Sequence, residues 1–170
     1  MPMVAVPIRT PPSLRAEHEE LHRELMAVAK LHGRLGEAAE AVVASLHPHI
    51  VKEETYVLPL LGALPSLAVG KIPPNDEEIR RLAERLEAEL GEMVREHRVI
   101  VTALKRFAEI AHQEGRTDLV QLAIKLKLHA ANEEEVLYPA QVLVGRYLDR
   151  VRPAFEEVPA ALSSEQDVEC

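Results

Sequence analysis

The sequence predicts an all-α fold, an antiparallel up-down-up-down four-helix bundle over residues 1–150. Apolar residues recur at steps of three and four between residues 13 and 149, and no sustained alternation of the kind that marks strands interrupts them. The chain has 170 residues, 47% of them hydrophobic, which is enough for one domain with a single core. Residues 151–170 are rich in proline and polar residues, so we expect a flexible C-terminal tail.

Glycines, prolines and helix-capping residues divide this pattern into four helices. Ser13 is a good N-cap for the first helix, and Asn75 opens the third. Gly33 and Gly115 follow the first and third helices and mark tight turns. The connector 62–74 carries three prolines and two glycines, and we expect it to be irregular. The four helices are expected at residues 13–32, 37–61, 75–115 and 117–149.

Composition excludes several classes of function. The formal charge of -8 disfavours binding to nucleic acid or to an anionic membrane, and aromatic residues at 3% provide few platforms for base stacking. The single cysteine, Cys170, cannot form an intrachain disulfide or a cysteine-based metal site, and we expect an exposed free thiol. The chain has neither a signal-peptide pattern nor a long apolar run, so we expect a cytoplasmic protein. The pattern leaves the oligomeric state and protein partners open.

An internal repeat places histidines and glutamates at matching positions in the two halves. The motif HxxxEE at 49–54 recurs at 129–134, displaced by 80 residues. The pair Glu17–His18 recurs as Glu96–His97 at an offset of 79. One HxxxE motif is expected by chance in a chain with eight histidines, whereas two copies inside a repeat are a much stronger signal.

Helix geometry places these residues at one level of the bundle. Positions i and i+4 share a helix face, and each of the six residues lies about 18–24 Å from its interhelical loop. Ionisable groups in a core cost several kcal/mol each unless they are satisfied, and a metal ion satisfies them. Hydrogen-bonded His–Glu pairs are the alternative, and the duplication favours metal. The candidate ligands are His18, His49, Glu53, His97, His129 and Glu133.

Two further residues are candidates for the centre. His22 lies four residues after His18 and could bind the same ion, or pack as an ordinary core histidine beside Leu25. Tyr56 follows Glu53 by three residues, so in a regular helix it points into the bundle and could hydrogen-bond to the centre or bind to it. Tyr138 lies nine residues after His129 and is expected to point away.

The pattern resembles the hemerythrin family, specifically the hemerythrin-like HHE cation-binding domain, over residues 13–149. The resemblance implies an antiparallel four-helix bundle that holds a non-haem di-iron centre. It implies two Fe ions, joined by an oxide or hydroxide and bridged by Glu53 and Glu133. The terminal ligands would be His18, His49, His97 and His129.

The sequence departs from the oxygen-carrying members of that family. Those members have a second histidine four residues after the histidine of the third helix, where this chain has Val101, and they end on HxxxxD rather than HxxxE. His22 occupies the equivalent place in the first helix, and we interpret it as the displaced ligand. An open coordination position would then lie on the His97 side, beside Val101. A ferritin-like site is excluded, because His112 of its second Glu-x-x-His motif lies too far along the bundle axis.

The resemblance and the ligand count together suggest a function. The six residues and the bridging oxygen leave two coordination positions open, or one if His22 also binds. We therefore expect a protein that binds or senses O2 or NO. The alternatives are an enzyme acting on peroxide or NO, and a protein for iron storage or iron-centre repair. No catalytic acid–base pair is recognisable outside the ligand set, which disfavours an enzyme.

Overall fold

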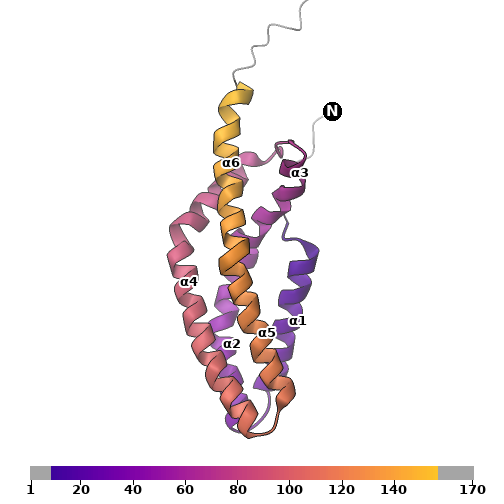
Figure 1. Ribbon diagram of the computed structural model, residues 1–170, viewed down its shortest axis with the longest axis vertical. Coiled ribbons are helices and arrows are strands. Elements are labelled where there is room, and N and C mark those ends of the chain that lie inside the picture. Colours follow the sequence, from indigo (N-terminus) through magenta and orange to yellow (C-terminus); the bar gives the residue numbers. More distant parts are fainter. Residues whose placement is uncertain (1–8, 157–170) are drawn as a thin grey trace, which may run out of the picture.

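The structure is a computed structural model that describes residues 9–156, with side chains up to Val151. It confirms the predicted all-α four-helix bundle (Figure 1), and the described part of the chain contains no strand. The elements are α1 (Pro12–Ala29), α2 (Arg34–Lys52), the π-helix η1 (Glu53–Val57), the 3-10 helix η2 (Leu58–Ala63), α3 (Leu64–Ala68), α4 (Asp76–Gln113), α5 (Thr117–Asn132), the π-helix η3 (Glu133–Leu137) and α6 (Tyr138–Glu156).

The helices alternate in direction, and α5, η3 and α6 together form one long fourth helix (Figure 1). The α1–α2 and α4–α5 turns lie at the same end of the bundle, at the bottom of Figure 1. Gly33 and Gly115 adopt φ values of 93° and 71°, a region that residues with a Cβ rarely enter. The predicted glycine turns therefore set the two hairpins that bring the halves of the repeat together.

Two boundaries differ from the sequence-based expectation. The connector 62–74 is partly helical, because η2 and α3 extend through Ala68. Pro65 lies in the first turn of α3, where a missing N–H costs nothing, so proline starts a helix here rather than breaking one. Helix α6 continues to Glu156, beyond the expected end at residue 149. The rest of the predicted tail, including Cys170, lies outside the described residues.

A π-helical turn begins at the glutamate of each HxxxE motif, which the sequence analysis did not predict. The N–H of Leu58 donates to the carbonyl of Glu53, and the N–H of Tyr138 donates to the carbonyl of Glu133. These are i→i−5 bonds, so each turn contains one residue more than an α-helical turn. All later side chains in the helix are thereby rotated by about 100° from the positions that a regular helix would give them.

A proline follows each π-helix and provides a physical reason for it. Pro59 and Pro139 each lie six residues after the glutamate of an HxxxE motif. A proline in a helix has no N–H to donate, and its ring clashes with the carbonyl four residues earlier. A wider turn relieves this clash. Pro48 lies within α2 without a π-helix, so the feature that the two π-helices share is a proline six residues after the glutamate.

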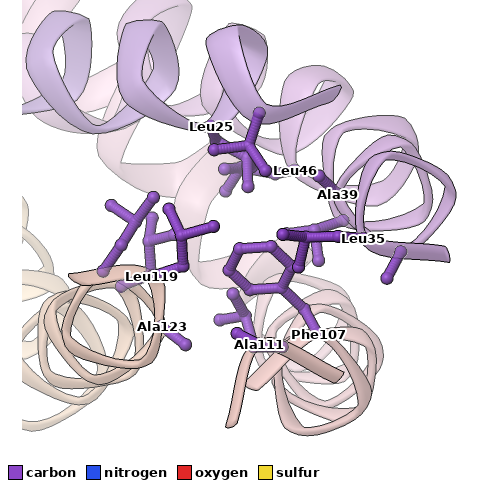
Figure 2. Packing of buried hydrophobic residues seen from close by; sticks show 14 of the residues in the cluster. Leu25, Leu35, Ala39, Leu46, Phe107, Ala111, Leu119 and Ala123 are labelled. Atoms are coloured by element: carbon purple, nitrogen blue, oxygen red, sulfur yellow. The ribbon is translucent and has the colours of Figure 1, made fainter. Parts of the chain in front are cut away.

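The buried core consists of two apolar clusters. The first lies toward the hairpin turns; in Figure 2 its side chains from α1, α2, α4 and α5 point toward one another around the ring of Phe107. The second contains residues from η1, η2, α4 and α6, including Tyr56, Leu86 and Leu148. Along three of the four long helices of the bundle, the candidate ligands lie between residues of the first cluster and residues of the second. Along α1, the ligand precedes the residues of the first cluster. The polar level is therefore enclosed by apolar packing. None of the helices within residues 9–156 is long and apolar enough to cross a membrane.

The close contact between α4 and α6 predicts opposite effects for two glycine-to-alanine substitutions. A Cβ on Gly145 would lie 2.4 Å from the Cβ of Ala83, so Gly145→Ala should lower the free energy of unfolding by about 1–3 kcal/mol through overpacking. The exposed Gly91 in α4 has only the Arg95 side chain nearby, at 3.6 Å. Gly91→Ala should therefore raise stability by about 0.5–1 kcal/mol. Urea denaturation measures both; a neutral Gly145→Ala would contradict the packing.

Candidate metal centre

The structure brings six of the predicted ligands together at one level of the bundle. They come from α1, the α2–η1 junction, α4 and the α5–η3 junction, and all six line one small internal cavity of about 20 Å³. Five of them are at most 2% exposed, and the side chain of His129 is 9% exposed. The six residues are His18, His49, Glu53, His97, His129 and Glu133.

Glu133 lies between two pairs of histidines. Its Oε1 is 3.3 Å from Nε2 of His18 and 3.0 Å from Nε2 of His129. Its Oε2 is 3.3 Å from Nε2 of His97. The two oxygens of one carboxylate thus face different imidazoles. This is the geometry of a carboxylate that can bridge two cations.

Glu53 is placed in the same way from the other half of the repeat. Its Oε1 is 3.4 Å from Nε2 of His49, and its Oε2 is 3.8 Å from Nε2 of His18. The donor atoms therefore form two groups, one containing His18 and His129 and the other containing His49 and His97. In each group the atoms lie within 4.8 Å of one another, and Glu133 belongs to both.

A second set of glutamates faces the outer nitrogen of each imidazole. Such carboxylates fix the tautomer and orientation of metal-binding histidines. These glutamates could have been found from the sequence, since each of them is the direct neighbour of a candidate ligand in the chain. Glu96 also forms an ion pair with Lys52. The Nδ1-to-carboxylate distances are 2.7 Å for His49–Glu96, 2.9 Å for His97–Glu134 and 3.2 Å for His129–Glu17. The 3.8 Å between Nδ1 of His18 and Glu54 is too long for a hydrogen bond.

This arrangement fits a cation better than a purely hydrogen-bonded core. When Nδ1 of His49 and of His97 donates to a carboxylate, each Nε2 carries a lone pair. These two Nε2 atoms lie only 2.7 Å apart, so they must share a proton or bind a common metal ion. The imidazoles and carboxylates around them are ordinary ligands for transition metals.

In the metal-free protein, protons supply part of this positive charge. Burial alone would lower the pKa of His129, but the hydrogen bond and charge of Glu133 raise it to about 9. Burial likewise opposes protonation of His49, and Glu53 and Glu96 nevertheless raise its pKa. Burial favours the neutral form of Glu133, yet its histidine neighbours hold its pKa well below the ordinary value. The site thus attracts cations strongly.

Tyr56 and Tyr138 are placed in the reverse of the way the sequence analysis expected. Tyr56 does not line the cavity; its hydroxyl donates to Glu89 over 2.5 Å. Tyr138 instead points inward, and its hydroxyl donates to Oε1 of Glu53 over 2.5 Å. The expectation assumed regular α-helices, and the π-helical turns rotate both side chains. Burial and the charges of Glu53 and Glu133 raise the pKa of Tyr138 in the metal-free protein.

His22 does not join either group of donor atoms. Its ring lies beside that of His47, with centroids 5.3 Å apart, so it faces α2 rather than the centre. Burial, followed by the charge of His47, lowers its pKa. The placement of His22 as a ligand assumed that i and i+4 residues of α1 reach one ion, whereas only His18 lies in the cavity lining. The structure therefore places His22 outside the two groups of donor atoms, and its role as a ligand stays a prediction.

The outer glutamates predict an effect on metal affinity at a distance from the ligands. Glu96→Ala removes the acceptor that orients His49 and should weaken metal binding by about 10–100-fold. Glu92→Ala is the matched control, because Glu92 lies one turn earlier on α4 and bonds only to the exposed Arg95. Competition with a chelator measures both affinities. Equal affinities would show that Glu96 has no orienting role.

Comparison with protein families supports the geometry. Residues 10–141 match the Hemerythrin HHE cation binding domain. Searches of curated proteins and of solved structures found no match. The family match covers most of the chain, and the buried His/Glu cluster lies within the matched residues. The chain is therefore a member of the hemerythrin family, with a metal-binding four-helix bundle.

Proposed function

We propose that this protein holds two iron ions in its core and binds a small diatomic molecule, O2 or NO, beside them. The observation that carries the proposal is the placement of Glu53 and Glu133, each of which faces both histidine pairs. His18 and His129 would hold one ion, and His49 and His97 the other. Iron rather than zinc or manganese is proposed from the family, because imidazole and carboxylate ligands suit all three.

The bridging assignment predicts unequal effects for neighbouring glutamates. Glu133→Ala and Glu53→Ala should each abolish most iron binding, because each removes a ligand from both ions at once. Glu135→Ala is the control, since Glu135 is exposed on the same π-helix. Iron is measured per chain after desalting, with two per chain expected for the unmodified protein. Full iron content in either bridging variant would contradict the assignment.

The surroundings of the ligands favour a small, uncharged guest. Apart from the six ligands, every residue that lines the cavity is apolar. A cavity of about 20 Å³ admits roughly one water-sized molecule. The iron pair would supply an open coordination position and the electrons for binding, while the walls limit water and proton access. The apolar lining residues are Leu21, Leu46, Ile50, Ile100, Leu126 and Ala130.

A spectroscopic titration tests this function. The anaerobic ferrous protein should change its visible spectrum on addition of O2 or NO, and the change should reverse when the gas is removed. The metal-free protein serves as the control and should show no change. Many turnovers with peroxide or NO would instead identify an enzyme. Transfer of iron to a chelator within minutes would identify a storage or donor protein.

A further inference from the structure

The hydroxyl of Tyr138 lies among the donor atoms of one histidine pair. Its Oη is 2.5 Å from Oε1 of Glu53 and 3.4 Å from Nε2 of both His49 and His97. Neighbouring ligand atoms of an octahedral ion with bonds of about 2.1 Å are roughly 3 Å apart. The three distances bracket this separation. Oη therefore lies close enough to these donor atoms to bind the same ion.

We propose that Tyr138 is a ligand of the metal ion held by His49 and His97, and that it binds through its phenolic oxygen. This inference rests on the proposed function, because it requires a metal at that place. Phenolate oxygen is a known ligand of iron in proteins. On binding, a metal–oxygen bond replaces the O–H bond, the proton leaves to solvent, and no change of oxidation state is needed.

The surrounding structure holds Tyr138 in this position. The side chain is 1% exposed, so it has little room to turn. Its ring stacks on that of His97, with centroids 5.7 Å apart and planes inclined by 14°. The π-helix η3 ends at the residue before it and directs it inward through the Tyr138-to-Glu133 backbone bond. Backbone and packing thus fix the oxygen before any metal arrives.

The other half of the repeat lacks this group. The equivalent position, 80 residues earlier, is Leu58, which is fully buried and cannot bind a metal. Tyr56 in η1 bonds to Glu89 instead. The two ions would then differ: the ion near His49 and His97 gains a phenolate, and the ion near His18 and His129 does not. The repeat would therefore give a chemically asymmetric centre.

A charge-transfer band provides the test, because phenolate bound to Fe(III) absorbs in the visible and enhances tyrosine ring modes in resonance Raman spectra. The full chain is loaded with Fe(II) without oxygen, oxidised in air and desalted, and iron is counted. We expect this band in the wild type and its loss in Tyr138→Phe. Tyr56→Phe is the matched control, since Tyr56 is equally buried but bonds to Glu89, and it should keep the band.

A second variant keeps the test valid if Tyr138→Phe fails to fold or to hold iron. The chain has three tyrosines, so Tyr56→Phe combined with Tyr147→Phe leaves Tyr138 alone, and this variant should retain the band in full. Iron bound without a phenolate band in the wild type would overturn the ligand role, leaving the proposed function intact. So would a band that persists in Tyr138→Phe or disappears from the double variant. Failure of the wild type to bind iron would overturn both proposals.

Discussion

Two carboxylates and four imidazoles buried at one level of the bundle are the constraint on which the rest of the structure depends. Uncompensated, buried ionised carboxylates would cost far more than the few kcal/mol by which a domain of this size is stable. The imidazoles offset that cost only when they carry protons or hold cations, as the raised pKa of His129 shows. The apolar clusters on either side keep water from satisfying these groups instead. Cation binding is therefore built into the energetics of the fold.

The outer glutamates connect the two halves of the repeat. Glu54 and Glu134 face the histidine that opens their own half. Glu17 and Glu96 face a histidine of the opposite half, His129 and His49 respectively. Each half therefore places one carboxylate toward an imidazole of its own and one toward an imidazole of the other half. A single half could not assemble the site, because it contains only half of the ligands.

The sequence predicted the bundle and the six clustered side chains because both depend on the regular α-helical period. His49 and Glu53, and likewise His129 and Glu133, are i and i+4 pairs, and the N–H of each glutamate still donates to the carbonyl of its histidine as in an α-helix. The widened turns begin at these glutamates and rotate the residues after them, so extrapolation of the α-helical period exchanged the roles of Tyr56 and Tyr138. Periodicity alone does not report a widened turn.

His22 shows a different limit of sequence analysis. It has a suitable spacing from His18, but spacing gives only the face of a helix and not the tilt of that face toward the ion. In the structure, its neighbour across the α1–α2 contact is His47. The spacing of ligands within one helix was predictable from the sequence. Whether the side chain of His22 packs on α2 or reaches the core depends on the tertiary arrangement.

The asymmetry of the centre bears on where a small molecule would bind. The sequence analysis placed the open position on the His97 side, on the assumption that His22 completed the other ion. With His22 turned away and Tyr138 as the proposed ligand beside His97, the open position would instead belong to the ion near His18 and His129. His129 and Glu17 also border a surface hollow of about 380 Å³, and the side chain of His129 is the most exposed of the six. The route by which a small molecule enters and the open position would then both lie at the ion near His18 and His129. The proposed phenolate would bind the other ion.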